Sequence, residues 1–383
     1  MARPSSVPLG NPVTSDVTDD RMNPRALLGY RPELDGLRGV AVLSVMVFHS
    51  GLIVGGWLGV DVFFALSGFL ITTLLVEEHD RTGRIRFGRF YVRRALRLLP
   101  ALLTLVIVMA LVLLATTSRE HRSYLVLYVA AVLFYFANWV EPFGIPLAWG
   151  FGHTWSLAIE EQFYLIWPLA LAGLLRLVRR RAAVAVIVTC GALLAFAYRM
   201  ALARAGVGHI RLFEGSDTHA DPLLIGCSLA FCISWNLLRD GRISRLVIKW
   251  LAGLSLLTLL GLFARARYPV DYVEHGVSTI TALCTVMIIA DVLGSHSLLA
   301  PMLRNWLLVR TGRVSYGLYL WHYPIFFALG IETYGPIANP WIIAAGWVAT
   351  VGISLVSFTV IEKPALRLKA RIAPVRSAEP IPT

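Results

Sequence analysis

The chain has 383 residues, of which 57% are hydrophobic and only 15% are charged, and its mean hydropathy is +0.68. Soluble domains contain roughly 45–50% apolar and about 25% charged residues, so this composition excludes an ordinary soluble domain. It also excludes a disordered chain, a collagen-like chain and a disulfide scaffold. The net charge of +12 would fit a nucleic-acid-binding protein, but the positions of Lys and Arg described below favour a lipid bilayer as partner and no nucleic acid.

The two ends of the chain differ from its long apolar middle. Residues 1–30 are polar and Pro-rich without the layout of a cleavable signal peptide, and we expect a flexible cytoplasmic tail there. A membrane domain is predicted at 31–366, and a short basic cytoplasmic tail at 367–383. Four cysteines lie in apolar runs without metal-binding or redox spacing, so we expect inert thiols and no metal. They are Cys190, Cys227, Cys232 and Cys284.

Eleven apolar segments approach the length of about 20 residues that a helix needs to cross a bilayer. In chain order they lie near 37–57, 58–78, 98–116, 124–140, 155–175, 183–203, 221–238, 247–264, 276–293, 314–331 and 340–361. No linker rich in charge or in Gly and Ser separates them. The sequence therefore predicts an all-α, polytopic membrane protein with one domain.

The basic residues indicate that one of these segments does not cross. If all eleven crossed from a cytoplasmic N-terminus, 17 Lys and Arg would lie inside and 18 outside, which is no bias. If 124–140 does not cross, 28 lie inside and 7 outside. We therefore predict about ten transmembrane helices plus one re-entrant or interfacial segment, with both termini on the cytoplasmic side of the plasma membrane.

Charge alone does not identify the segment that fails to cross, because omitting 98–116 or 155–175 gives a bias that is at least as good. We choose 124–140 because 98–116 is more apolar and because 124–140 ends in the amphipathic residues YFANW. The segment 155–175 stays an alternative, since it carries two glutamates. A segment that enters without crossing must be surrounded by protein or line a water-filled cavity, so we expect a cavity near 138–162.

The first predicted span carries two ionisable residues, Arg38 and His49. They are eleven positions apart, which in a helix places both on one face with a rise of about 16 Å. His49 is thus expected near the middle of the membrane, where an ionisable residue is a functional candidate. Asp61 enters the second span at a matching depth and could orient the imidazole. The alternatives are packing of His49 between helices and a helix-start role for Asp61.

Two further features carry charge at the membrane. Glu160 and Glu161 lie in the fifth apolar segment, and at most one of them is expected to face His49 because adjacent helical residues point about 100° apart. The loop after the second span carries seven arginines, of which Arg94 and Arg97 share one helix face. Guanidinium groups suit phosphate oxygens, although contact with lipid headgroups is the alternative interpretation.

Several motifs occur in order between residues 31 and 366. They are ELDGLRGVAVLSVMVFH (33–49), GVDVFFALSGFLI (59–71), RFYVRRALRLLP (89–100), HTWSLAIEEQFYLIWP (153–168), SYGLYLWHYPI (315–325) and IEKP (361–364). Together they resemble the membrane-bound acyltransferase-3 family. The resemblance places the family's essential basic residue and histidine on Arg38 and His49, and its second basic motif on Arg94 and Arg97.

The resemblance implies an O-acyltransferase that moves an acyl group, commonly acetyl, from acyl-CoA to a hydroxyl of a cell-envelope sugar, glycolipid or similar molecule. Some members carry a C-terminal hydrolase-like domain outside the cytoplasm, and because this chain ends at residue 383 we expect the form without it. Acetyl-CoA or another acyl-CoA is the expected donor, and the acceptor is expected to be a carbohydrate or glycolipid.

With this resemblance, the expected site has two sides. Arg94, Arg97 and Arg38 would bind the CoA phosphates from the cytoplasm, while His49 acts as general base. Asp61 and Glu160 or Glu161 would line an outward cavity for the acceptor. Direct transfer and an acyl-histidine intermediate both remain open. Candidate donors to the oxyanion are Ser67, which would act near the bound CoA, and Tyr164.

The remaining polar sites have weaker signals. His322 reaches mid-membrane depth among aromatic residues, and we expect a packed aromatic cluster there rather than a second base. Asp217, His219 and Asp221 precede the seventh apolar segment, where they either cap a helix or contact a polyol. The competing class is a proton-coupled transporter or flippase that uses the same histidine and carboxylates as a proton relay. The absence of an evident inverted repeat argues against that class.

Overall fold

The computed structural model describes residues 29–116, 124–145, 150–237, 241–294, 297–333 and 337–372. The regular structure in these ranges is entirely helical, so the predicted all-α class is confirmed. Most of both predicted tails lies outside the described residues. In chain order the elements are α1 (Pro32–His49), η1 (Gly56–Leu58), α2 (Gly59–Thr82), α3 (Phe87–Thr116), α5 (Leu125–Leu133), α6 (Ala137–Val140), α7 (Thr154–Leu177), α8 (Arg181–Arg204), α9 (His209–Glu214), α10 (Asp221–Ser234), α11 (Arg242–Arg265), α12 (Val270–His275), α13 (Val277–Leu293), α14 (Ala300–Leu303), α15 (Trp306–Arg313), α16 (Ser315–Ala328), α17 (Pro340–Ser357), the π-helix η2 (Phe358–Glu362) and α18 (Lys363–Ile372).

Within the described residues, five helical stretches are long and apolar enough to cross a membrane. They are Gly56–Thr82, Phe87–Thr116, Arg181–Arg204, Ile243–Arg265 and Pro340–Leu368. Helices α10 and α13 are apolar but shorter, and α1, α7 and α16 coincide with the other predicted spans. The chain thus has the architecture of a multi-pass membrane protein, and the count of about ten spans stays a prediction.

The segment predicted not to cross is broken in the structure. Helix α5 has nine residues, a length of about 14 Å, which is about half of a bilayer core. The chain then turns at Tyr135, whose φ is +57°, before the four-residue helix α6. By contrast, α3 and α7, the two alternatives, are continuous over 30 and 24 residues. This geometry favours 124–140 as the segment that does not cross.

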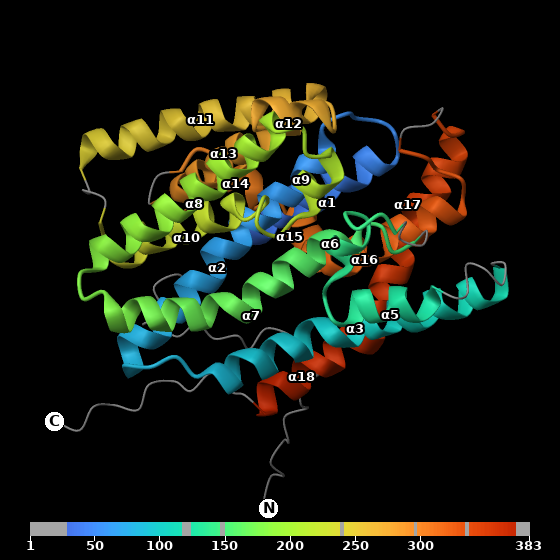
Figure 1. Ribbon diagram of the computed structural model, residues 1–383, viewed down its shortest axis with the longest axis horizontal. Coiled ribbons are helices and arrows are strands. Elements are labelled where there is room, and N and C mark those ends of the chain that lie inside the picture. The colour runs from blue at the N-terminus through green and yellow to red at the C-terminus, as the bar shows by residue number, and fades with distance from the viewer. Residues whose placement is uncertain are drawn as a thin grey trace, which may run out of the picture.

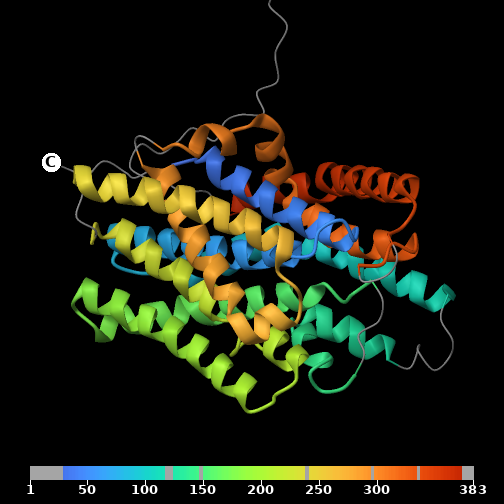
Figure 2. The ribbon, with the colours of Figure 1, turned by 90° about the horizontal axis from the view of Figure 1, so that it is seen from above.

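Helix α2 lies in the middle of the bundle and packs against α1, α7, α10 and α13. In Figure 1, α11 runs along one long side of the molecule, and α3 and α18 run along the opposite side. Figure 2 shows the bundle from above, with α8 along one edge and α17 toward the other. Because α2 touches elements from most of the chain, its polar residues are placed to join distant helices.

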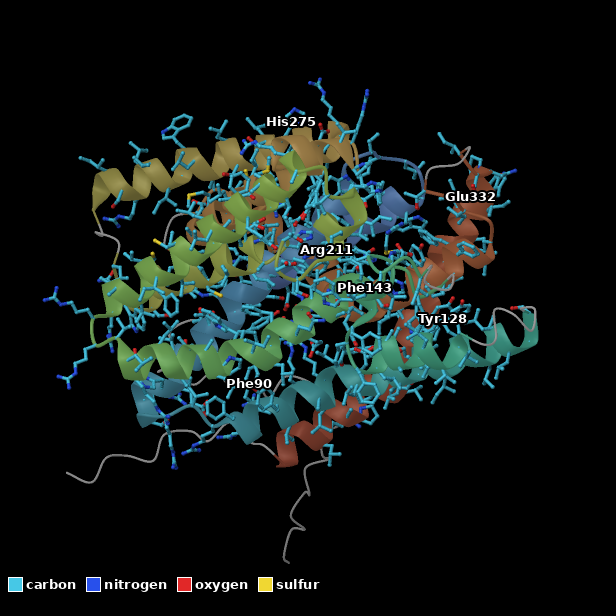
Figure 3. The ribbon with its side chains drawn as sticks, viewed as in Figure 1. Phe90, Tyr128, Phe143, Arg211, His275 and Glu332 are labelled. Carbon is cyan, nitrogen blue, oxygen red and sulfur yellow. The ribbon has the colours of Figure 1, made fainter. Side chains whose placement is uncertain are left out.

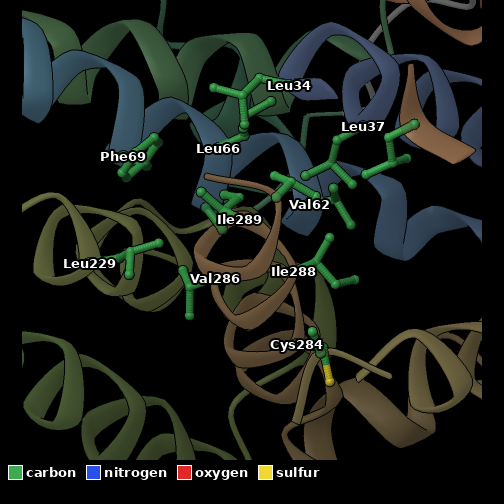
Figure 4. Close-up of a cluster of buried hydrophobic side chains, with 14 of the residues drawn as sticks. Leu34, Leu37, Val62, Leu66, Phe69, Leu229, Cys284, Val286, Ile288 and Ile289 are labelled. Atoms are coloured by element: carbon green, nitrogen blue, oxygen red, sulfur yellow. The ribbon is translucent and has the colours of Figure 1, made fainter. Parts of the chain in front are cut away.

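Glycines allow the closest of these contacts. A Cβ atom on Gly68 of α2 would lie 1.9 Å from the carbonyl oxygen of Leu223, and one on Gly226 of α10 would lie 2.0 Å from that of Ala65. The two helices can therefore approach only because both positions lack a side chain, as is common where membrane helices pack. Behind this contact, α1, α2, α10, α11 and α13 share a buried apolar cluster (Figure 4).

Candidate active site

A cavity of about 470 Å³ lies among α1, α2, α3, α7 and α16. We call it the arginine cavity, because its lining includes six arginines against three glutamates. These are Arg38, Arg81, Arg89, Arg93, Arg94 and Arg97, with Glu77, Glu78 and Glu160. On α2 the lining extends from Val60 to Arg81, about 32 Å along the helix axis, which matches the thickness of a bilayer core.

The two ends of this cavity differ in character. The end near the α2–α3 connection carries most of the arginines, together with Phe90 of α3 (Figure 3). The other end is lined by Val60, Phe63 and Phe64 of α2 and by two hydroxyl groups described below. A ligand with an anionic head and a narrow, less polar arm would match this division.

Two arginines that line the cavity, Arg38 and Arg97, have no ion-pair partner among the described residues. Arg38 donates from Nε and Nη2 to the hydroxyl of Ser315 at 3.3 and 3.2 Å. Within the described part of the chain, neither Arg38 nor Arg97 has a carboxylate within ion-pair distance. A positive charge in such a place is expensive unless an anion neutralises it. An anionic ligand in the cavity would neutralise these two charges.

Arg94 is held by the two glutamates of α7. Its Nη2 lies 3.7 Å from Glu160 Oε1, and its Nε lies 3.5 Å from Glu161 Oε1. The guanidinium carbon sits 3.4 Å above the ring of Tyr164. The hydroxyls of Tyr164 and Ser67 both donate to Glu160. Glu160 thus anchors one wall of the cavity.

This arrangement corrects two sequence-based expectations. We expected at most one of the two glutamates to face His49 and line the acceptor cavity, but both contact Arg94 of α3. Buried carboxylates need a counter-charge, and Arg94 supplies it to both. The expected use of Ser67 and Tyr164 as free oxyanion donors also does not fit, because Glu160 already accepts from both hydroxyls.

Three histidines from three parts of the chain meet beyond the apolar end of the cavity. His49 ends α1, His153 precedes α7, and His322 lies in α16. The ring centroids of His49 and His322 are 5.2 Å apart, and those of His153 and His322 are 5.6 Å apart. We call this group the histidine cluster. Arg38 and His49 lie on one continuous helix, as the sequence predicted, with a rise of about 16 Å between them.

The histidine cluster has free hydrogen-bonding capacity. His49 Nδ1 lies 3.0 Å from Thr333 Oγ1. His322 Nδ1 faces the carbonyl oxygen of Tyr319 at 2.7 Å, and since a carbonyl only accepts, this nitrogen carries the proton. His322 Nε2 is therefore a buried lone pair, and neither it nor the two ring nitrogens of His153 has a hydrogen-bond partner among the described residues. The cluster is aromatic, as expected for His322, but several of its buried ring nitrogens have no hydrogen-bond partner among the described residues.

Two hydroxyls separate the arginine cavity from the histidine cluster. The hydroxyls of Ser156 and Tyr319 lie 2.5 Å apart, and both residues line the cavity. The Tyr319 ring contacts the rings of His153 and His322 at centroid distances of 5.5 and 5.4 Å. The arginine cavity and the histidine cluster thus meet at this pair.

Asp61 does not lie against His49, and the expectation that it orients that imidazole is wrong. Its Oδ1 accepts from His219 Nε2 at 2.7 Å and from the hydroxyl of Ser278. Matching depth in a hairpin does not decide which face a residue turns to. Here Asp61 faces α10 and α13, the helices that pack on the other side of α2.

A second buried pair adjoins this contact. Arg199 of α8 donates to both carboxylate oxygens of Asp221, at 2.5 and 3.1 Å, and both side chains are fully buried. Asp221 also accepts from Thr279, so it does not act as the predicted helix cap, a position that Ala220 occupies. We call Asp61, His219, Ser278, Arg199, Asp221 and Thr279 the sealed network. Asp217 lies apart from it, in an exposed ion pair with Arg211 of α9 (Figure 3).

His153 and Arg199 are among the polar residues that the sequence analysis did not single out. His153 stands in a loop just before α7, where no helical periodicity links it to His49. Among the described residues, no group of three or more His, Cys, Asp or Glu side chains is placed to hold a metal ion, the histidine cluster included.

The sequence profile of the acyltransferase-3 family, described as an acyltransferase domain, matches residues 31–359. This chain belongs to that family. The match covers α1 with Arg38 and His49, the arginine cavity and the histidine cluster. The family membership predicted from the ordered motifs is therefore confirmed, and the chain has a multi-pass helical architecture.

Curated relatives are similar over much of this chain. The peptidoglycan O-acetyltransferase OatA of Listeria monocytogenes is 33% identical over 350 residues, which cover 88% of this chain and 56% of OatA. The O-acetyltransferase OatA of Staphylococcus aureus strain NCTC 8325 is 34% identical over 310 residues, which cover 77% of this chain and 50% of that protein. The chain thus spans about half the length of the curated relatives that it matches. No solved structure matches it.

Proposed function

We propose that this protein is a membrane O-acyltransferase that moves an acetyl group from cytoplasmic acetyl-CoA to a hydroxyl of an outward-facing envelope sugar or glycolipid. The observation that carries the proposal is the arginine cavity, which leads from unneutralised arginines to the edge of the histidine cluster. The family and the names of the OatA relatives support acyl transfer to oxygen.

Acyl-CoA fits the division of the cavity. Its nucleotide carries the phosphates, which suit the guanidinium groups of Arg38, Arg94 and Arg97. The positive-inside distribution supports a cytoplasmic position for the arginine-rich connection between α2 and α3, on the side where CoA is found. The pantetheine arm is narrow and can follow the apolar face of α2, so that the thioester arrives beside Ser156 and Tyr319. In this proposal Glu160 and Glu161 hold Arg94 rather than the acceptor.

His49 is the proposed general base. It takes the proton from the acceptor hydroxyl while that oxygen attacks the thioester carbon, a role that typically contributes about 10²–10⁴-fold to the rate. The bond from carbon to sulfur then breaks, and the CoA thiolate recovers the proton. Thr333, on the Nδ1 side of His49, fixes the orientation of the ring. An acyl-histidine intermediate is the variant of the same step.

The acceptor is proposed to approach from the outward end, because His49 lies at the end of α1 remote from Arg38. A peptidoglycan-like or other carbohydrate hydroxyl is the substrate class that the relatives suggest. The acceptor would then not compete with CoA for the arginine-lined entrance.

A transfer assay tests the proposal against the transporter class. Purified protein is incubated with radiolabelled acetyl-CoA and muropeptide or lipid-linked sugar acceptors, and acetylated product is separated by chromatography. We expect label in an acceptor ester and release of free CoA. A transporter would neither hydrolyse acetyl-CoA nor transfer from it, and that result would contradict the proposal.

A further inference from the structure

Acyl transfer creates a negative charge on the carbonyl oxygen, and that oxyanion needs hydrogen-bond donors that are in place before the reaction. Six hydroxyl-bearing side chains line the arginine cavity. They are Ser67, Ser156, Tyr164, Ser315, Tyr316 and Tyr319. The donor should be one that lies near the histidine cluster and whose proton is not held by a stronger acceptor.

Four of these hydroxyls do not meet this requirement. Ser67 and Tyr164 donate to the carboxylate of Glu160. Tyr316 donates to the backbone carbonyl of Leu98 at 3.0 Å. Ser315 binds Arg38 and stands at the start of α16, one turn nearer the arginines than Tyr319. None of the four is therefore a free donor beside the histidines.

Ser156 and Tyr319 differ because they share an acceptor. Tyr319 lies 3.1 Å from the carbonyl oxygen of His153, and Ser156 lies 3.3 Å from the same oxygen. The two hydroxyls are 2.5 Å apart, so only one of them needs to donate to that carbonyl at a time. The other proton can turn to a ligand without leaving a buried carbonyl unsatisfied, which would be costly.

We propose that the hydroxyl pair of Ser156 and Tyr319 is the oxyanion-binding group of the acyl transfer. This inference rests on the proposed function. When the acceptor oxygen bonds to the thioester carbon, the carbonyl electron pair moves to its oxygen and the acceptor proton moves to His49. Tyr319, backed by Ser156, donates a hydrogen bond to that oxyanion. Collapse restores the carbonyl, breaks the bond to sulfur and returns the proton to the thiolate.

The main test compares two tyrosine-to-phenylalanine variants. Tyr319→Phe should lower kcat by about 10²–10³-fold, the usual effect of losing one oxyanion donor, while KM for acetyl-CoA changes little. The matched control is Tyr272→Phe, since Tyr272 is also buried and donates to a backbone carbonyl at 3.0 Å, but lies outside the cavity. The control should keep kcat within about threefold of the wild type.

A second readout separates oxyanion binding from packing. Affinity is measured for a CoA derivative that carries a tetrahedral methylphosphonate in place of the acetyl group, and for the acetonyl ketone analogue. Tyr319→Phe should weaken the anionic analogue at least tenfold more than the ketone. If Tyr319 had only a structural role, the variant would lose affinity for both analogues by the same factor. If Tyr319→Phe does not fold, Ser156→Ala carries the same comparison.

The outcomes distinguish the inference from the function on which it rests. Wild-type protein that neither binds nor uses acetyl-CoA would contradict the proposed function. Wild-type protein that transfers acetyl groups, together with a Tyr319→Phe variant of unchanged kcat and unchanged analogue ratio, would overturn the oxyanion role alone.

Discussion

The sealed network and the arginine cavity both place charge inside a helical bundle, but they treat it in opposite ways. In the sealed network, Arg199 and Asp221 form a two-bond ion pair, Asp61 accepts from His219, and all four side chains are fully buried. In the arginine cavity, Arg38 and Arg97 face a space and have no carboxylate partner in the described part of the chain.

The difference indicates what each region is for. A buried charge that its neighbours neutralise ties helices together, and here it joins α2, α8, α10 and α13. Arg38 and Arg97 are only partly buried and have no carboxylate partner among the described residues, so the space beside them can take an anion from outside the protein. Mid-membrane depth alone does not distinguish these cases. The hydrogen-bond and ion-pair partners do, because they join Asp61 to other helices and leave Arg97 without a carboxylate partner among the described residues.

His49→Ala should produce the largest effect on activity. We expect acetyl transfer to fall by about 10²–10⁴-fold because the general base is lost. Thermal unfolding in detergent should stay close to the wild type, since His49 is bonded only to Thr333 among the described side chains. Near-normal turnover of the variant would remove His49 from the mechanism.

Asp221→Asn should have the opposite effects to His49→Ala, with lower stability and unchanged ligand binding. It leaves Arg199 buried without its counter-ion, which typically costs about 3–5 kcal/mol of stability. We expect a large drop in the unfolding midpoint, while the protein that stays folded binds CoA with wild-type affinity. An unchanged unfolding midpoint together with lost CoA binding would place the sealed network in the ligand site. The two regions would then no longer differ in role.

Glu214→Gln should give a smaller, pH-dependent effect. Glu214 lies in α9, outside the spans, where burial and the nearby Glu141 raise its pKa to about 9. Between the usual carboxyl pKa and this value the folded state holds a proton that the unfolded state releases, so wild-type stability falls as pH rises. The Glu214→Gln variant lacks this dependence of stability on pH. Its unfolding midpoint should exceed that of the wild type at pH 8 and approach it at pH 5. An equal pH dependence of the two midpoints would contradict the raised pKa of Glu214.

Much of this site could be predicted from the sequence, because helical spacing and the distribution of charge act locally. The period of a helix is enough to predict that Arg38 and His49 share one face and that Arg94 and Arg97 share another. The count of basic residues indicated that one segment does not cross, and the more apolar 98–116 and the amphipathic end of 124–140 led to the choice of 124–140. The structure brings Arg38, Arg94, Arg97 and Ser67 to one cavity.

The partners of the carboxylates could not be predicted in this way. Glu160 and Asp61 have neighbours that are 66 and more than 150 positions away in sequence, and which helix packs beside α7 or α2 is a property of the whole bundle. His153 was missed because it lies in a loop. Asp221 was misjudged as a possible cap because a charge at a helix start has two common uses, and only the position of Arg199 decides between them.

The central claim is that the unneutralised arginines bind CoA, and calorimetric titration of CoA into purified protein tests it most directly. Arg97→Ala should weaken binding at least tenfold, and Arg97→Lys should restore it only in part, because a point charge does not replace a fork of donors. The matched control is Arg84→Ala, an exposed arginine of the same connection that does not line the cavity. The account predicts wild-type affinity for the control and a weaker salt dependence for Arg97→Ala. Equal affinity of the wild type and Arg97→Ala for CoA would contradict it.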